Sequence, residues 1–227
     1  MAFSLDRVIP WGRSFAEYRQ MFALTDDDLR KRILGCADGP ASFNAEATKL
    51  GADITSVDPI YAFSAAEIRG RIKVVCPQVL EQTRANYDDF VWTEFPTVHA
   101  LGRTRLRAMV RFLRDFPIGR EVGRYVTAEL PQLPFESVTF ELALCSHLLF
   151  LYSDHLDEQF HVDAVTELCR VADEVRIFPL ITLANKPSAH VEAVMRAVTA
   201  LGTHARIETV PYEFQRGGNQ MLRIGDF

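Results

Sequence analysis

The sequence predicts an α/β fold with a doubly wound, mainly parallel sheet of seven strands that ends in an antiparallel hairpin. Short apolar runs typical of buried strands alternate with segments whose apolar residues recur at helical spacing. Near the C-terminus, two strand-like runs flank the sequence QRGG, which indicates a hairpin turn. With 227 residues, of which 48% are hydrophobic, the chain has the size and composition of one domain, spanning 1–227.

The first predicted βαβ unit follows an N-terminal helical segment, residues 1–31. Within that segment, Ser14 and Glu17 have the spacing of a capping box, which starts a short helix. RILGC is the first strand, and apolar residues at helical spacing then continue up to Gly51, which ends the helix. DITSVD is the second strand.

A long insertion is expected after the second strand. Roughly sixty residues separate it from RYVTAEL, the next clear strand, which is several times the usual connection in an α/β unit. Ser64 and Glu67 form a second capping box, and they open a helical region that Pro77 is expected to interrupt or kink. A further helix follows in GRTRLRAMVRFLRDF. We therefore expect a helical cap, at about residues 65–120, over the C-terminal edge of the sheet.

The rest of the chain completes the alternation. RYVTAEL is the third strand, and ELALCSHLLFLY is a buried fourth strand. The helix that follows has Phe160, Ala164, Leu168 and Val171 on one stripe, and EVRIFPLI is the fifth strand. A helix over residues 188–201 then leads to ARIETVPYEF and NQMLRI, the two strands of the hairpin.

Composition excludes several classes of function. A net charge of −5 and a pI near 5.7 disfavour nucleic-acid binding, which depends on neutralising phosphates with Lys and Arg. No apolar run reaches about 18 residues, and proline and charge interrupt the N-terminus before a signal core forms, so we expect a soluble, cytoplasmic protein that does not bind membranes. The four scattered cysteines contain no CxxC pair and are expected to be reduced thiols.

A group of His and Asp residues after the fourth strand suggests a metal site as an alternative. Its members are His147, Asp154, His155, Asp157 and His161. Their spacing does not place three ligands on one helix face, as HExxH does, so we expect no metal.

The loop GCADGPAS after the first strand is the main candidate for a ligand site, because ligands of doubly wound sheets bind at the carboxyl ends of the strands. Gly39 is flanked by Ala37 and Ala41, which permit close approach if their φ angles are negative. Pro40 and the charge of Asp38 at the start of the next helix disfavour a dinucleotide pyrophosphate. A cationic or zwitterionic ligand is more compatible with this acid.

Asp58 ends the second strand, where its carboxylate is placed to accept both hydroxyl protons of a ribose. Together with the loop, this acid resembles the pattern of the class I S-adenosylmethionine-dependent methyltransferases over about residues 32–224, excluding the cap. The resemblance implies a Rossmann-like fold, methyl transfer and S-adenosylmethionine as cofactor. It places Gly35 where the family has an acid and puts alanines at two glycine positions of the loop. The cofactor-binding residues that it implies here are Gly35, Ala37, Asp38, Gly39, Asp58, Pro59 and Ile60.

Later segments extend the resemblance. AELPQLPF resembles the third-strand motif, which implies that Glu129 binds the adenine amino group and that Leu130 is an adenine wall. ALCSHLL resembles the segment beneath the methionine moiety and contributes Cys145 and Ser146. PWGRSFAEY resembles the helix that covers the cofactor, so Trp11 and Arg13 are further binding candidates, Arg13 for the cofactor carboxylate. Structural roles stay open for these residues, including a turn cap for Asp58 and a solvated loop for Glu129.

His147 stands just past the fourth strand, where methyl transfer would occur. It is the candidate general base for an oxygen or nitrogen acceptor, because the pKa of histidine is easily moved near neutrality. A structural hydrogen bond beneath the cap is the alternative role.

The cap and the acidic surface favour a small-molecule acceptor in an enclosed pocket. The run Arg103, Arg105, Arg107, Arg111 and Arg114 is interpreted as a solvated face, with an anionic substrate or partner as the alternative. Two other functions stay open: a binding protein for S-adenosylmethionine without transferase activity, and a nicotinamide-dependent oxidoreductase, which the missing glycines disfavour.

Overall fold

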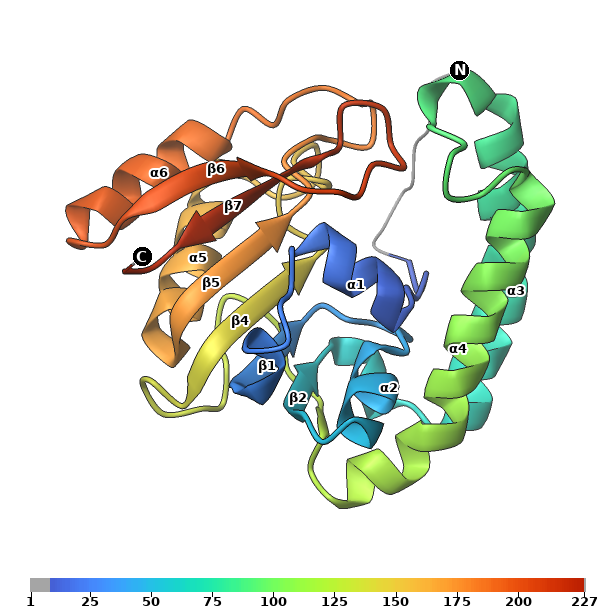
Figure 1. The fold of residues 1–227 in the computed structure, drawn as a ribbon, viewed down its shortest axis with the longest axis horizontal. Coiled ribbons are helices and arrows are strands. Elements are labelled where there is room, and N and C mark those ends of the chain that lie inside the picture. Colours follow the sequence, from blue (N-terminus) through green and yellow to red (C-terminus); the bar gives the residue numbers. More distant parts are fainter. Residues whose placement is uncertain (1–8, 227) are drawn as a thin grey trace.

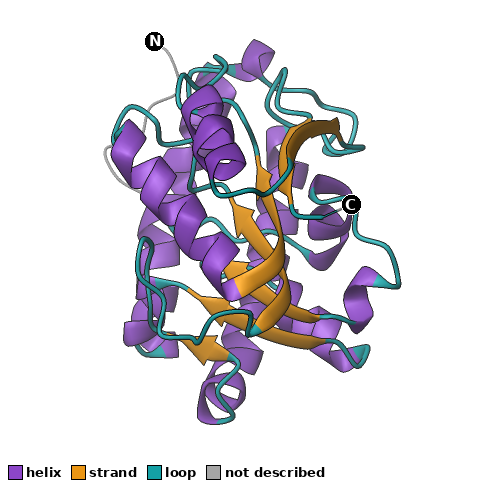
Figure 2. Ribbon diagram, turned by 90° about the vertical axis from the view of Figure 1, so that its left-hand side faces the viewer, coloured by secondary structure: helices purple, strands orange, loops and turns teal. Residues whose placement is uncertain are grey.

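The computed structural model describes residues 9–226 and contains one seven-stranded sheet with helices on both sides (Figures 1 and 2). Residues 1–8 of the predicted N-terminal segment lie outside the described residues. The strands are β1 (Arg32–Cys36), β2 (Asp53–Val57), β3 (Tyr125–Val126), β4 (Phe140–Ser146), β5 (Ala172–Phe178), β6 (Ala205–Thr209) and β7 (Gln220–Ile224). The α-helices are α1 (Phe15–Met21), α2 (Phe43–Lys49), α3 (Ala65–Ala85), α4 (Val98–Glu121), α5 (Glu158–Val171) and α6 (Val191–Ala200).

The strand order is β3-β2-β1-β4-β5-β7-β6. The first five strands in this order are parallel, whereas β7 pairs antiparallel with both β5 and β6. This confirms the predicted fold class, a Rossmann-like doubly wound sheet with an antiparallel C-terminal hairpin. The order reverses between β1 and β4, so the loops after these two strands diverge and leave room for a ligand.

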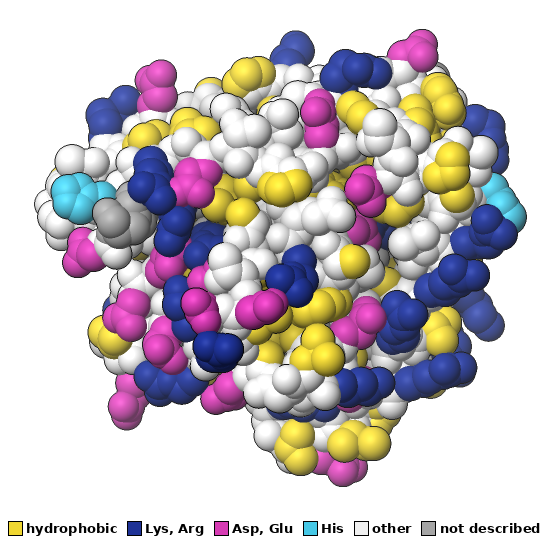
Figure 3. Space-filling model, viewed as in Figure 1, with side chains coloured by type: hydrophobic (Ala, Val, Ile, Leu, Met, Phe, Trp, Pro, Cys, Tyr) yellow, Lys and Arg dark blue, Asp and Glu magenta, His cyan; other side chains and the backbone are white. Residues whose placement is uncertain are grey.

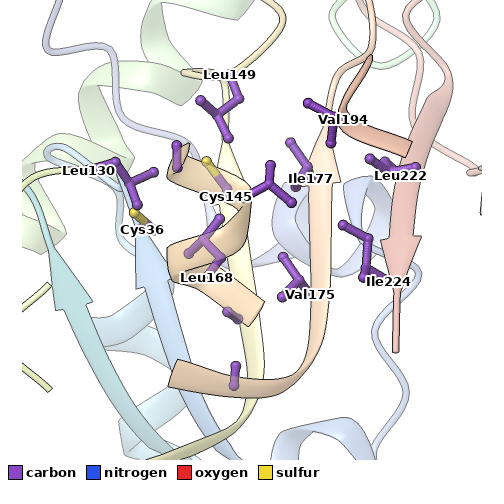
Figure 4. Packing of buried hydrophobic residues seen from close by; sticks show 14 of the residues in the cluster. Cys36, Leu130, Cys145, Leu149, Leu168, Val175, Ile177, Val194, Leu222 and Ile224 are labelled. Atoms are coloured by element: carbon purple, nitrogen blue, oxygen red, sulfur yellow. The ribbon is translucent and has the colours of Figure 1, made fainter. Parts of the chain in front are cut away.

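Alternate residues of each strand belong to different hydrophobic clusters on the two faces of the sheet. Leu34 of β1 and Ala143 of β4 pack with α5 and α6, whereas Ile33 and Leu142 pack with α1 and α2. Figure 4 shows part of the first cluster, in which Leu168 of α5 lies over the sheet. Each fully buried aliphatic side chain of this kind contributes about 1.5–3 kcal/mol to the free energy of unfolding.

The predicted capping boxes begin α1 and α3, where both the Ser and the Glu side chains make their hydrogen bonds. Residues between β2 and β3 form α3 and α4, two long helices packed against each other beside the sheet (Figure 1). Tyr61 stacks on Phe112 and meets Tyr125 edge-on, which joins α4 to the β2–β3 edge of the sheet.

Two local details are more precise in the structure than in the sequence predictions. Pro77 does not interrupt α3, which continues through it from Ala65 to Ala85, and a kink at this residue stays a prediction. The third strand is only two residues long, because RYVTAEL leaves the sheet edge after Val126. Within residues 9–226, no helix is long and apolar enough to cross a membrane.

Candidate functional site

A cavity of about 710 Å³ lies at the carboxyl ends of β1, β2, β4 and β5. It is enclosed by α1, by the α3–α4 pair and by the chain that follows β6, residues 210–218. Its volume is in the range of roughly 300–1,000 Å³ that is typical of small-molecule sites. The cavity therefore lies where the strand order predicts a ligand.

The loop after β1 forms one wall of the cavity with Ala37, Asp38 and Gly39. Both Ala37 and Gly39 have positive φ angles, 58° and 53°. The condition of a negative φ is therefore not met at Ala37, and the loop holds an alanine in the left-handed region that favours glycine. Tyr61 fixes the turn, because its hydroxyl donates to the Gly39 carbonyl at 2.8 Å.

Asp38 occupies a different place from the one that the sequence suggested. Its carboxylate does not lie free at the start of α2 but is buried, accepting from the hydroxyls of Tyr18 at 2.7 Å and Ser56 at 2.6 Å. A Cβ on Gly35 would lie 2.0 Å from Asp38 Oδ2. The carboxylate of Asp38 thus fills the space that a side chain at position 35 would take. Burial raises its pKa to about 6, although both hydroxyl hydrogen bonds oppose the rise.

This environment makes the stability of the unliganded protein depend on pH through Asp38. Its folded pKa of about 6 exceeds the ordinary 3.8, so its contribution to stability is complete below about pH 4 and is lost as the pH rises through 6. Asparagine keeps the shape of the neutral form at every pH. The unfolding free energy of wild type minus that of Asp38→Asn should therefore fall between pH 4 and pH 6 in urea titrations. A difference that stays constant or rises would contradict this prediction.

Asp58 follows β2 and faces the same loop from the neighbouring strand. Its Oδ2 accepts from the Gly39 amide at 2.8 Å, and its Oδ1 accepts from the Ile60 amide at 2.8 Å. Burial raises its pKa to about 6, and the charge of Glu129 adds to the rise, whereas the two amide hydrogen bonds oppose it. Pro59 and Ile60 line the cavity beside it. The predicted loop and the predicted ribose acid therefore come together.

Arg13 and Trp11 line the cavity from the segment before α1. The N-terminal segment is fixed there because the Ser42 amide donates to the Arg13 carbonyl, and a Cβ on Gly12 would lie 2.1 Å from the Pro40 carbonyl oxygen. Arg13 Nη1 donates to the Trp11 carbonyl at 2.9 Å, and its Nε is buried without a partner.

The charge of Glu17 acts on Arg13, but from beyond ion-pair distance. Among residues 9–226, no carboxylate forms an ion pair with Arg13. Burial and the nearby Arg105 lower its pKa to about 10, so it stays protonated at neutral pH. A buried cation of this kind favours an anionic ligand.

Ser146 and His147 line the cavity where β4 ends. His147 has a φ of 56°, and its amide donates to the Phe178 carbonyl at 2.8 Å, which ties the turn to β5. Its Nδ1 shares a 2.9 Å hydrogen bond with Ser146 Oγ. Burial, followed by the charges of Arg13 and Arg105, lowers the pKa of His147, so its imidazole is neutral at neutral pH.

Four of the predicted cofactor-binding residues do not line the cavity. Gly35 lies behind the Asp38 carboxylate, and Glu129 is exposed. Leu130 and Cys145 are part of the hydrophobic core beneath the loops, where Cys145 is paired in register with Cys36 (Figure 4). Direct ligand contacts of Gly35, Glu129, Leu130 and Cys145 stay predictions. All four cysteines of the chain are free thiols.

The run of arginines on α4 divides into two kinds of residue. Arg103, Arg107, Arg111 and Arg114 are exposed, and Figure 3 shows Lys and Arg side chains gathered on the side where α4 lies. Arg105 is buried and lines the cavity. The interpretation of the whole run as a solvated face is therefore wrong for this residue. Its position could have been found from its spacing, because it lies on the same helical stripe as the buried residues Leu101, Ala108 and Phe112.

Arg105 belongs to a buried network that joins three parts of the chain. Its Nη1 donates to Glu17 Oε1 of α1, and its Nη2 donates to the Tyr212 hydroxyl at 3.2 Å. The Tyr212 hydroxyl in turn donates to Glu17 Oε1 at 3.0 Å. The network therefore connects α1, α4 and the chain after β6 around the cavity.

Among the His and Asp residues after β4, His161 Nδ1 lies 2.7 Å from the Asp157 carbonyl oxygen. In the part of the chain that the structure describes, no group of three or more His, Cys, Asp or Glu side chains is arranged to hold a metal. His161 instead accepts from the Phe150 amide at 3.0 Å through its Nε2, so it supports the turn after β4.

No model of a known protein family matches the chain. The chain is 36% identical over 214 residues to the uncharacterized protein MJ0045 of Methanocaldococcus jannaschii, a match that covers 94% of each chain. The chain belongs to the same family as MJ0045. Membership of the MJ0045 family confers no reaction on this chain, because the archaeal relative is itself uncharacterized.

Solved methyltransferase structures resemble this member of the MJ0045 family in fold. Magnesium protoporphyrin IX methyltransferase from Synechocystis PCC 6803, solved with bound S-adenosylmethionine, is 12% identical with a TM-score of 0.46, over 88% of this chain and 72% of that one. A possible histamine N-methyltransferase from Thermotoga maritima is 11% identical with a TM-score of 0.43, over 93% and 88% of the two chains. At these scores the likenesses assign neither ligand nor reaction.

Proposed function

We propose that the protein binds S-adenosylmethionine in the cavity and transfers its methyl group to a small-molecule acceptor. Asp58 is the observation that carries the proposal. Its carboxylate stands at the end of β2 beside the point where the strand order reverses, and each oxygen accepts one backbone N–H. A carboxylate oxygen accepts more than one hydrogen bond, so both keep capacity for the two hydroxyls of a ribose.

The neighbouring residues fit the rest of this cofactor. The carboxylate of Asp58 is the nearest group that a Cβ on Gly39 would meet, at 3.8 Å, so the loop leaves space for a ligand. Arg13 offers a buried guanidinium without an ion-pair partner for the cofactor carboxylate. The carboxylate of Asp38 fills the space beside Gly35, and we propose that it faces the cationic part of the cofactor. The resemblance in sequence supports the same assignment.

The cofactor supplies an electrophilic methyl group when it is bound. The residues of the chain position the acceptor and exclude water, which together provide most of the catalysis in a transfer of this kind. The α3–α4 pair, α1 and residues 210–218 enclose the cavity for that purpose. His147 is placed at the end of β4 to contact the acceptor, and its neutral imidazole can take a proton where the acceptor carries one.

A small acceptor in the cytoplasm fits the remaining properties of the chain. The cavity is partly open to solvent, but its volume of about 710 Å³ limits the size of its occupant, and the exposed arginines of α4 do not line it. The net charge of −5 disfavours nucleic acid as the acceptor.

Calorimetric titration tests the proposal directly. S-adenosylhomocysteine and S-adenosylmethionine are each expected to bind at one site with a dissociation constant on the order of micromolar. NADH serves as the control ligand, because its pyrophosphate would have to approach the turn beside Pro40, where the Asp58 carboxylate already accepts from the Gly39 amide, and no binding is expected. Binding of NADH without binding of either sulfur ligand would overturn the proposal in favour of an oxidoreductase.

A further inference from the structure

The acidic residues of the cavity are confined to one side of it. Asp38 and Asp58 follow β1 and β2, and Glu67 lies in the first turn of α3. This side, where Asp58 and the β1 loop lie, is the proposed cofactor side.

The opposite side is called the acceptor side below. Its lining consists of Val74, Val75, Val79, Thr83, Phe90, Leu101, Arg105, His147, Leu151, Tyr152, Pro179, Leu183, Tyr212, Phe214, Gln215 and Gly218. Among these described residues there is no acid, and Arg105 is the one that carries a charge at neutral pH. A protonated amine would lose its hydration there without gaining a counter-ion.

The acceptor side is apolar over most of its wall. Val74, Val75 and Val79 of α3 line the cavity together with Leu183 and Phe214. Phe90 and Phe214 stack with ring centroids 4.8 Å apart, which forms an aromatic end to this side. A hydrocarbon or aromatic skeleton is therefore favoured by burial against these side chains.

Of the three arginines that line the cavity within the described residues, Arg71 lies one turn after Glu67 on the cofactor side, whereas Arg13 and Arg105 lie near His147. Arg13 and Arg105 both lie close enough to affect His147, and no acid is among the charged groups that act on it. Arg13 is the proposed partner of the cofactor carboxylate. Arg105 donates through Nη1 to Glu17 and through Nη2 to Tyr212, but its Nε is buried without a hydrogen-bond partner in the described part of the chain. An anionic group on the acceptor would be stabilised at this point, and an ammonium group would be repelled.

We infer that the acceptor is an apolar carboxylic acid that is methylated on oxygen to give its methyl ester. This inference rests on the proposed methyl transfer. A lone pair of the carboxylate oxygen forms the new C–O bond while the C–S bond breaks, and the electrons of that bond neutralise the sulfonium. No proton has to move, because the acid is already ionised at neutral pH. This agrees with the neutral, weakly basic His147, which then orients the acceptor without deprotonating it.

Two probes with the same skeleton and opposite charges test the inference. 4-Phenylbutyrate and 4-phenylbutylamine are titrated calorimetrically into the protein saturated with S-adenosylhomocysteine. The acid is expected to bind at least tenfold more tightly than the amine. When S-adenosylmethionine replaces S-adenosylhomocysteine, the protein should convert 4-phenylbutyrate to methyl 4-phenylbutyrate. Mass spectrometry detects this ester.

A pair of α3 variants locates the preference in the cavity. Val74→Glu adds a carboxylate to the acceptor side at a residue that is 65% exposed, so folding should be preserved. Gln78→Glu makes the same charge change at an exposed position of α3 that does not line the cavity. Val74→Glu should weaken binding of the acid about tenfold and strengthen binding of the amine, whereas Gln78→Glu should change neither.

The outcomes separate this inference from the proposed function. Failure of S-adenosylhomocysteine to bind would reject both. If it binds, but the amine binds as tightly as the acid or neither probe binds at millimolar concentration, the acceptor class is wrong and the cofactor assignment stands. An acid preference that Val74→Glu and Gln78→Glu reduce equally would also overturn the inference, because it would place the acid outside the cavity.

Discussion

Asp58→Ala is expected to weaken binding of S-adenosylhomocysteine by about 100-fold or more. The side chain offers one carboxylate oxygen to each ribose hydroxyl, and hydrogen bonds to a charged group contribute about 1.5–3 kcal/mol each. The loss of two such bonds corresponds to at least a hundredfold change in the dissociation constant. The substitution also leaves the amides of Gly39 and Ile60 without their acceptor, which loosens the loop that the ligand meets.

Asp53→Ala is the matched control, since Asp53 is the exposed first residue of β2, at the opposite end of the strand. The affinity of Asp53→Ala for S-adenosylhomocysteine should equal that of wild type in calorimetry.

Wild-type affinity should decrease as the pH is lowered through about 6, because the raised pKa of Asp58 means that its carboxylate becomes protonated in that range. Asp58→Ala should show a smaller pH dependence, to which only Asp38, whose pKa is also about 6, still contributes. Unchanged affinity in Asp58→Ala would remove the basis of the proposed function.

The fold could be predicted from the sequence because its signals are local. Alternation of apolar residues in β1 and β4 and the stripe on α5 depend on residues a few positions apart, and the structure uses them to cover two faces of one sheet. Asp58 and Gly39 were predictable for the same reason. Asp58 lies directly after β2 and Gly39 lies in the loop after β1, and neighbouring parallel strands bring their ends together.

The rest of the site depends on contacts between distant parts of the chain. The carboxylate of Asp38 turns under the loop because Gly35 leaves space for it and because Tyr18 and Ser56 supply hydroxyls from α1 and β2. The spacing of residues within the loop contains no information about either hydroxyl. Arg105 could be placed on the buried stripe of α4 by periodicity, but its partner Glu17 is 88 positions away and already had a local role in the capping box.

Arg105→Met is expected to lower the free energy of unfolding by about 3–5 kcal/mol, as for other buried ion pairs that lose one partner. Methionine fills much of the same volume, so the main effect is electrostatic: Glu17 keeps its charge in a buried position without the guanidinium. Urea denaturation monitored by fluorescence measures the change. Arg107→Met, at an exposed position of the same helix, is the control and should change stability by no more than about 0.5 kcal/mol.

The double variant Glu17→Gln with Arg105→Met separates the loss of a charge partner from the loss of packing. Glutamine still accepts from the Tyr212 hydroxyl and needs no counter-ion, so the double variant should recover more than half of the stability lost by Arg105→Met alone. If the double variant is as unstable as the single one, packing of the arginine stem is what matters.

Because this network joins α1, α4 and residues 210–218, the single variant Arg105→Met should also open the cavity and show faster hydrogen exchange at the amides of α1. Unchanged exchange there would mean that the ion pair stabilises α4 locally and does not hold the cavity closed.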